Sequence, residues 1–206
     1  KNKLPKDSVV QVSEGRKLKL SAEHASGNTI SGNGNVEITD LDKMEDADLS
    51  KIINKGEKIL KIEEDTDIKG TLPKDCTLQV NDGKKLTLGA DKADGNTITG
   101  SGDVEITDLD KKEDADLSKV KNTGDKKIKI DEDTTIRGKL PNGCTLEVKD
   151  GKKLTLPAKQ ADGNTRNWIG NVEITDLDKK ENADLSKVKN TGDKNIKIDK
   201  DTNFNG

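Results

Sequence analysis

Residues 77–88, Thr77-Leu-Gln-Val-Asn-Asp-Gly-Lys-Lys-Leu-Thr-Leu88, carry the pattern that decides the fold of this chain. Apolar and polar side chains alternate on both sides of Asn81-Asp-Gly83, as expected for two short β-strands joined at a tight corner. Asp-Gly between alternating runs indicates a hairpin, because both residues tolerate positive φ, and it equally suits the corner of a β-solenoid. The local pattern leaves both arrangements open.

The same stretch recurs 68 residues earlier and 68 residues later, with Ser13-Glu-Gly15 and Lys149-Asp-Gly151 at the corner. From Leu4 onward the chain keeps this spacing without insertion or deletion, and Leu4, Leu72 and Leu140 are each followed by proline. A long internal repeat is the sequence signature of solenoids and arrays. The sequence predicts three repeat units, residues 3–70, 71–138 and 139–206.

Each unit contains about seven short runs typical of strands, and no run has a convincing helical period. In the second unit these runs lie at 77–80, 84–88, 96–100, 103–109, 115–120, 126–130 and 134–137, and a polar stretch occupies 90–95. Short strands separated by polar corners are typical of coils of roughly 20 to 25 residues. We therefore predict an all-β fold, a parallel β-helix or β-solenoid with about three coils per unit, in which residues 1–206 form one continuous solenoid.

A small independent β-domain in each unit is the structural alternative. No Pro- or Ser-rich linker separates the units, and only 28% of the residues are hydrophobic, with one Phe, one Trp and no Tyr. A separate unit would therefore have a thin core for its size. In a solenoid, neighbouring coils bury one another's apolar faces, so few large side chains suffice.

Charge and hydropathy argue against two classes of partner. The 37 basic and 40 acidic residues are well mixed and leave a net charge of −3, so no basic stripe is present to neutralise phosphates, and nucleic acid is not an expected partner. No run approaches the roughly 20 apolar residues of a membrane span, so no membrane insertion is predicted. Because Lys1 opens in the middle of the pattern, we expect the chain to be a segment of a longer protein whose neighbouring repeats contact it.

Cys76 and Cys144 occupy equivalent positions, which Ser8 fills in the first unit. With three coils per unit at about 4.8 Å, the two sulfur atoms would lie near 14 Å apart, beyond the ~7 Å Cα separation that a disulfide allows. Two free thiols are expected.

An acidic segment, Thr107 to Asp116 in the second unit, recurs with equivalents beginning at Thr39 and Thr175. Clustered carboxylates are ligands that calcium prefers, so each acidic corner is a candidate calcium site. The segment lacks the glycine of an EF-hand loop, and Lys111 and Lys112 intrude where a metal site would avoid cations, which favours a solvated, self-neutralising corner. The candidate ligands are the aspartates Asp40, Asp42, Asp46, Asp48, Asp108, Asp110, Asp114, Asp116, Asp176, Asp178 and Asp184.

No catalytic constellation is found in the sequence. His24 is the only histidine, and Lys92 and Gln160 replace it in the other units. No phosphate loop, nucleophile elbow or Cys/His metal cluster occurs, and three copies of one surface suit multivalent contact or spacing more than catalysis. The third unit departs from the pattern at Arg166–Ile169, where Trp168 is expected to take over the inward position that Arg166 leaves.

Three repeated segments carry a family resemblance. Asn-Val-Glu-Ile-Thr-Asp-Leu-Asp, Ala-Asp-Leu-Ser-Lys-Val and Asp-Gly-Lys-Lys-Leu-Thr-Leu resemble tandem modules of very long bacterial surface proteins of the adhesin type, over all three units. The resemblance implies an extracellular, non-enzymatic stalk or array on the bacterial cell surface, without a cofactor, and it transfers no binding residue.

Other functions remain open at this point. One is a binding module that holds calcium or a glycan at each acidic corner, and another is a viral tail fibre; an enzyme of the polysaccharide-lyase β-helix kind would need one unique cluster of residues. Since both ends of a solenoid expose unpaired edges, end-to-end self-association is also predicted.

Overall fold

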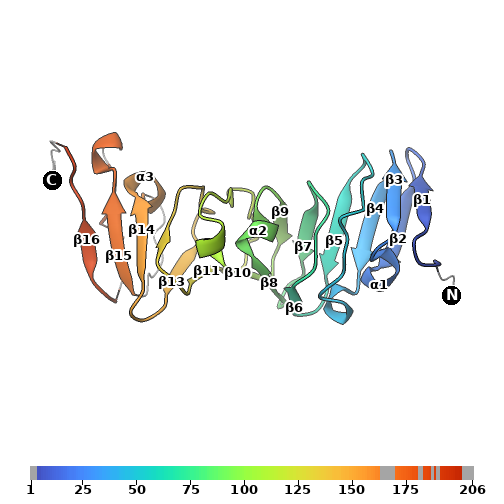
Figure 1. The fold of residues 1–206 in the computed structure, drawn as a ribbon, viewed down its shortest axis with the longest axis horizontal. Coiled ribbons are helices and arrows are strands. Elements are labelled where there is room, and N and C mark those ends of the chain that lie inside the picture. Colours follow the sequence, from blue (N-terminus) through green and yellow to red (C-terminus); the bar gives the residue numbers. More distant parts are fainter. Residues whose placement is uncertain (1–3, 163–169, 181–182, 187, 189–190, 201–206) are drawn as a thin grey trace.

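The computed structural model describes residues 4–162, 170–180, 183–186, 188 and 191–200. The chain is elongated, its termini lie at opposite ends, and the strands run across the long axis (Figure 1). The first unit contains β1 (Val9–Val12), β2 (Lys17–Ser21), α1 (Ala22–Ala25), β3 (Thr29–Gly32), β4 (Asn35–Thr39), the 3-10 helix η1 (Leu41–Lys43), β5 (Lys58–Ile62) and β6 (Thr66–Ile68).

The elements of the later units follow in the same order. The second unit contains β7 (Thr77–Val80), β8 (Lys85–Gly89), α2 (Ala90–Ala93), β9 (Thr97–Gly100), β10 (Asp103–Thr107), η2 (Leu109–Lys111), β11 (Lys126–Ile130) and β12 (Thr134–Thr135). The third contains β13 (Thr145–Val148), β14 (Lys153–Pro157), α3 (Ala158–Ala161), β15 (Asn171–Thr175), η3 (Leu177–Lys179) and β16 (Lys194–Ile196).

Every pairing between the described strands is parallel. The sheets have the strand orders β1-β3, β2-β4-β5-β7-β9, β6-β8-β10-β11-β13 and β12-β14-β15-β16. Directly paired residues lie about 20 positions apart in the sequence, as Val36 and Lys58 do in the pairing of β4 with β5. A strand-rich fold with parallel sheets, as predicted, is therefore confirmed. The strands on either side of Asp82-Gly83, β7 and β8, lie in different sheets, so this corner is not a hairpin.

Two predicted elements of the second unit differ from the structure. The stretch 115–120 is not a strand, because Val120 N–H bonds locally to the Leu117 carbonyl at 3.0 Å and only Asp116 and Val120 form isolated bridges. Residues 90–95 are not simply a loop, because Ala90–Ala93 forms one helical turn that buries both alanines completely.

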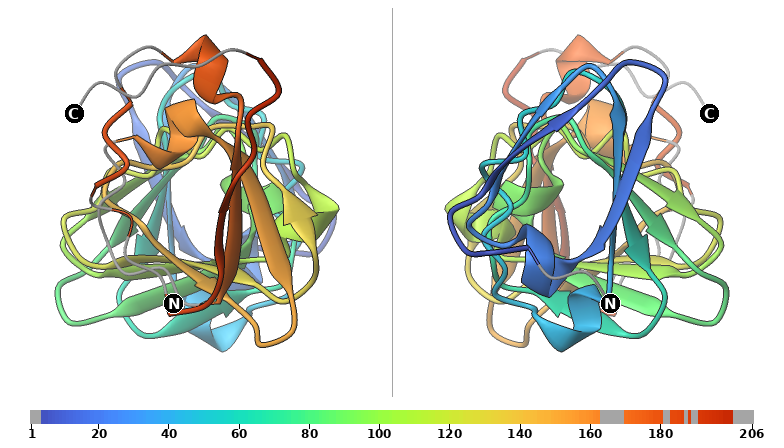
Figure 2. Two further views of the ribbon diagram at one scale, coloured as in Figure 1. Left: turned by 90° about the vertical axis from the view of Figure 1, so that its left-hand side faces the viewer. Right: turned by 90° about the vertical axis from the view of Figure 1, so that its right-hand side faces the viewer.

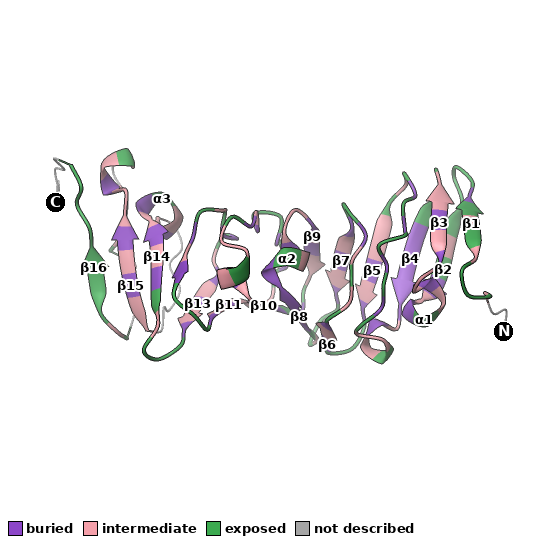
Figure 3. Cartoon of the chain, viewed as in Figure 1, coloured by how far each residue is buried: buried purple, intermediate pink, exposed green. Residues whose placement is uncertain are grey.

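One continuous apolar core extends along the molecule between the sheets (Figures 2 and 3). Alternation places every second strand side chain inside, and the pairing brings these side chains into rows. Leu60, Leu78 and Ile98 are paired in register on three neighbouring strands, and each is 0% exposed. Branched aliphatic side chains in rows therefore replace the large aromatic core that the composition lacks.

The unit is longer than three pairing steps. From Leu20 these steps lead through Ile38 and Leu60 to Leu78, whereas Leu88, the residue equivalent to Leu20, lies in another sheet. The equivalent strands β2, β8 and β14 thus belong to three different sheets. The 3-10 helices η1, η2 and η3 accordingly lie at different places around the long axis (Figure 2, light blue, yellow-green and dark orange). Three pairing steps therefore fall short of one unit, and the number of coils per unit stays a prediction.

Candidate functional site

The acidic corners begin with an aspartate in the left-handed conformation. Asp40, Asp108 and Asp176 have φ values of 56°, 56° and 55° and directly precede η1, η2 and η3. The short polar side chain of aspartate makes it one of the few residues that adopt this conformation readily. Each corner therefore turns at the same residue, and the following leucine, Leu41, Leu109 or Leu177, is buried.

A lysine three residues later neutralises each of these aspartates. Lys43 pairs with Asp40 and Lys111 with Asp108, and Lys179 Nζ lies 2.5 Å from Asp176 Oδ1. A hydroxyl group also stabilises the carboxylate, since Thr107 Oγ1 donates a hydrogen bond to Asp108 at 2.8 Å. The Lys111 ammonium and this hydroxyl hold the pKa of Asp108 below its usual range.

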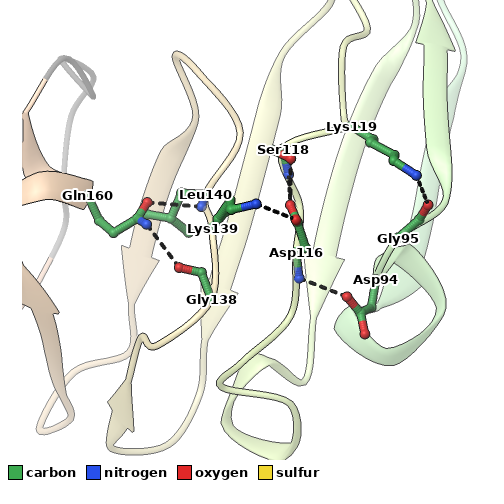
Figure 4. Close-up of polar contacts among 9 residues, drawn as sticks. All are labelled: Asp94, Gly95, Asp116, Ser118, Lys119, Gly138, Lys139, Leu140 and Gln160. Atoms are coloured by element: carbon green, nitrogen blue, oxygen red, sulfur yellow. Dashed lines mark hydrogen bonds and ion pairs between the residues drawn. The ribbon is translucent and has the colours of Figure 1, made fainter.

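The last aspartate of each corner caps a turn of its own chain. Asp48, Asp116 and Asp184 each accept a hydrogen bond at 3.0 Å from the backbone N–H two residues later. Lys139 also lies 2.8 Å from Asp116, and it is the main cause of a strong lowering of the Asp116 pKa (Figure 4). All three carboxylates shape the backbone, and that of Asp116 also pairs with lysine.

The remaining candidate ligands are spread along the corner. Lys112 lies 2.8 Å from Asp114 and lowers its pKa, and Lys200 lies 3.7 Å from Asp178. Asp42 and Asp110 lie within the 3-10 helices, and Asp46 is exposed.

The structure does not assemble these aspartates into a ligand set. In the part of the chain that the structure describes, no three acidic, histidine or cysteine side chains lie close enough together to hold a metal ion. Calcium prefers six to eight oxygen ligands, whereas these corners present carboxylates one at a time beside ammonium groups. Calcium binding stays a prediction, and the chemistry that the corners do display is neutralisation and turn formation.

Two glutamates of the same corners have a role that the sequence analysis missed. The Glu113 carboxylate accepts a hydrogen bond from Thr135 N–H at 2.8 Å, and its backbone carbonyl accepts from Arg137 and Gly138. Glu45 repeats this contact in the first unit, and Lys69 Nζ lies 2.7 Å from its carboxylate. These glutamates join the corner to the chain 22 residues later.

Glu105 is the centre of a charged row on the outer face of one sheet. Its side chain, 9% exposed, lies between Lys85 on β8 at 2.9 Å and Lys129 at the end of β11 at 3.0 Å. Glu37 also pairs with two lysines, Lys17 and Lys19, which both lie on β2. Burial raises the pKa of Glu105, but the hydrogen bonds from Lys85 and Lys129 outweigh this effect and hold the pKa below its usual range.

A groove lies where the first unit meets the second. It has a volume of 380 Å³ and lies between residues 69–75 and 91–96, with Lys92 in its wall. At the equivalent place in the third unit, Gln160 donates to the Gly138 carbonyl at 2.9 Å and accepts from Leu140 N–H at 3.1 Å (Figure 4). Lysine has no acceptor and cannot make this bridge, and Lys92 Nζ instead bonds Asp91 at 3.3 Å.

The two cysteines and the histidine noted in the sequence lie in surroundings that explain them as parts of the fold. Cys76 and Cys144 are both free, as predicted, and they are buried, which raises the pKa of each thiol to about 12. His24 is half-buried and its Nδ1 lies 2.8 Å from Ser21 Oγ. Arg166–Ile169 lies outside the described residues.

Among the described residues, no helix has both the length and the apolar character that crossing a membrane requires. Comparison with known proteins finds no family model, no curated protein and no solved structure that matches the chain.

Proposed function

We propose that the chain is a parallel β-solenoid that serves as a non-enzymatic stalk or array segment of a large, adhesin-type protein of the bacterial cell surface. The observation that carries the proposal is the parallel pairing that continues from β1 to β16 across four sheets. Such pairing stacks one circuit of chain on the next at about 4.8 Å, so additional units add length.

In the proposed solenoid, residues 1–206 form one continuous body of three units. Each unit overshoots three coils by one side of the cross-section, since β2, β8 and β14 lie in three sheets. The single apolar core supports this view over three separate domains. The junction between the first two units lies inside one sheet, because β5 pairs with β7 there.

A passive role fits the chemistry of the acidic corners. Their carboxylates are paired with lysines such as Lys111 and Lys139, and exposed pairs of this kind contribute little to stability. Their main effect is a soluble, neutralised surface along the sheet edges.

Thermal unfolding followed by far-ultraviolet circular dichroism, with and without millimolar calcium, tests the function. The stalk predicts a β-type spectrum and a Tm that calcium leaves unchanged, because a ligand that does not bind the folded state cannot stabilise it. Magnesium is the matched control for ionic strength.

A calcium-dependent rise in Tm would contradict the passive stalk and favour the repetitive ligand-binding module. Titration calorimetry would then show about three equivalent sites per chain, one for each acidic corner. Replacing Asp108 and Asp110 by Asn would remove one of the three sites.

A further inference from the structure

The groove between the first two units contains a backbone donor and a backbone acceptor that bond nothing in the part of the chain that the structure describes. They are the Leu72 N–H and the Gly70 carbonyl, and both residues line the groove. Each residue is half-buried, so a molecule that enters the groove can reach both groups.

The third unit shows which chemical group fits this pair. Gly138 and Leu140 occupy the equivalent positions, and the side-chain amide of Gln160 bonds both, at 2.9 and 3.1 Å (Figure 4). Lys92 takes the place of Gln160 in the second unit and has no acceptor to offer. The chain therefore contains its own example of a carboxamide on this pair of backbone groups.

The backbone is held in the same way in the two units. Thr71 N–H donates to the Ala47 carbonyl at 3.0 Å. Its equivalent, Lys139, donates to the Ala115 carbonyl at the same distance. Because the chain is held from the same side in both units, the unbonded groups of the second unit face the same way as the bonded groups of the third.

The charged side chains around the groove balance one another. They are three lysines and three aspartates, Lys69, Lys74, Lys92, Asp75, Asp91 and Asp94. Such a wall favours neither a free anion nor a free cation. The volume of 380 Å³ lies at the small end of the range for ligand sites. Both properties suit a small, neutral and polar ligand.

We propose that the groove binds a primary carboxamide, the group at the end of a glutamine side chain. Its nitrogen donates to the Gly70 carbonyl and its oxygen accepts from Leu72 N–H, as Gln160 does in the third unit. A carboxylate has no donor for Gly70, and an ammonium group has no acceptor for Leu72. Free glutamine and a glutamine of another polypeptide both carry this group.

Titration of the isotope-labelled protein with propionamide, followed by amide NMR spectroscopy, tests the site. Propionamide should shift the Leu72 resonance and leave that of Leu140 unchanged, because Gln160 already bonds Leu140. The matched control is N,N-dimethylpropionamide, which keeps the carbonyl group and lacks the N–H donors. It should bind on the order of tenfold more weakly, because the Gly70 carbonyl then has no donor.

Two reciprocal variants move the site. Lys92→Gln supplies the amide from within the chain and should abolish the Leu72 shift. Gln160→Lys should release Leu140 and make its resonance respond to propionamide as well. The remaining amide resonances show whether each variant is folded.

Three results would overturn the proposal. They are an unresponsive Leu72 in the unaltered chain, an equal response of Leu72 in Lys92→Gln, and an unresponsive Leu140 in folded Gln160→Lys.

The two sources of the carboxamide are distinguished by titrating free L-glutamine and the peptide Gly-Gly-Gln-Gly-Gly. Tighter binding of the peptide would assign the groove to a partner polypeptide, and tighter binding of the free amino acid would assign it to a metabolite. The peptide Gly-Gly-Glu-Gly-Gly is the control for charge and length. If it shifts Leu72 as strongly as the glutamine peptide does, the groove does not select a carboxamide.

Discussion

The side chain at position 92 lies in the wall of the groove between the first two units. At the equivalent position Gln160 bridges Gly138 and Leu140, whereas Lys92 turns toward Asp91. Lys92→Gln supplies the missing donor and acceptor, and each new hydrogen bond contributes about 1 kcal/mol. We expect the free energy of unfolding to rise by about 1 to 2 kcal/mol in urea denaturation.

The reciprocal exchange is the matched control. Gln160→Lys removes both hydrogen bonds and should lower the free energy of unfolding by a similar amount. If neither variant changes the urea midpoint, the bridge does not contribute to stability.

Glu105 links the stability of the protein to pH. Because its pKa is depressed in the folded state, its contribution is present above the ordinary value of 4.5 and is lost as the pH falls through the lower, folded pKa. Glu105→Gln should cost about 2 kcal/mol at pH 7, since two lysines lose a nearly buried partner. It should also flatten the loss of stability below pH 4.5, measured by urea denaturation across pH.

Glu147 provides the comparison for this variant. Its side chain is 37% exposed and pairs with Lys127 at 3.1 Å, so Glu147→Gln should cost only about 0 to 1 kcal/mol. Equal effects of the two substitutions would contradict the role assigned to burial at Glu105.

Residues whose partners are close in the sequence were predictable, and those with distant partners were not. The pairing of Asp108 with Lys111 follows from their spacing and supports the self-neutralising corner. Glu113 bonds a backbone group 22 residues away, and Gln160 bonds one 20 residues away. Only the folding of chain segments about 20 residues apart against each other brings these atoms together, and a single sequence does not give their register.

Among the elements, the connection before β11 depends on close contact between glycines. A Cβ atom on Gly124 would lie 2.4 Å from the carbonyl oxygen of Gly102 and 2.6 Å from that of Ser101. These are backbone atoms, so the two circuits must move apart. Gly124→Ala should therefore reduce the free energy of unfolding by about 3 kcal/mol in urea denaturation.

Gly83 is the control because its corner has space. It has a φ of +66° and no atom within 4 Å of an added Cβ, so Gly83→Ala pays only for the left-handed conformation, about 1 to 2 kcal/mol. A smaller loss for Gly124→Ala than for Gly83→Ala would contradict the close approach.

Alternation identified most strands but not the single helical turns. Val80 and Leu88 lie in strands where the period of two predicts them. A turn such as Ala90–Ala93 has only four residues, too few to display a helical period, and its small alanines do not mark it as apolar. At 115–120, Leu117 and Val120 are buried three residues apart, a spacing that local turns share with helices and that strands do not.

For the molecule as a whole, composition and repeat predicted a strand-rich fold with parallel sheets. They did not predict how each unit is placed around the long axis relative to the one before it. This placement depends on the number of residues between directly paired positions, which differs between the pairing of Leu60 with Leu78 and that of Ile38 with Leu60. These spacings are set by corners such as η1 and by the glycine contacts, which involve atoms far apart in the sequence. The acidic corners therefore face different sides, a feature that the repeat alone does not reveal.

The direction of the strands also determines how the molecule responds to tension. The strands cross the long axis, so the hydrogen bonds between them point along it (Figure 1). A load applied at the two termini would peel one strand from the next instead of shearing a whole sheet. In the proposed solenoid, each circuit of about 20 residues would lengthen from about 5 Å to roughly 65 Å when it unwinds.

Stretching single molecules in an optical trap should therefore give many small, evenly spaced steps at low force, and one large rupture would contradict this geometry. Such a molecule yields gradually and dissipates a sudden pull, so whatever is attached at its far end experiences a smaller peak force.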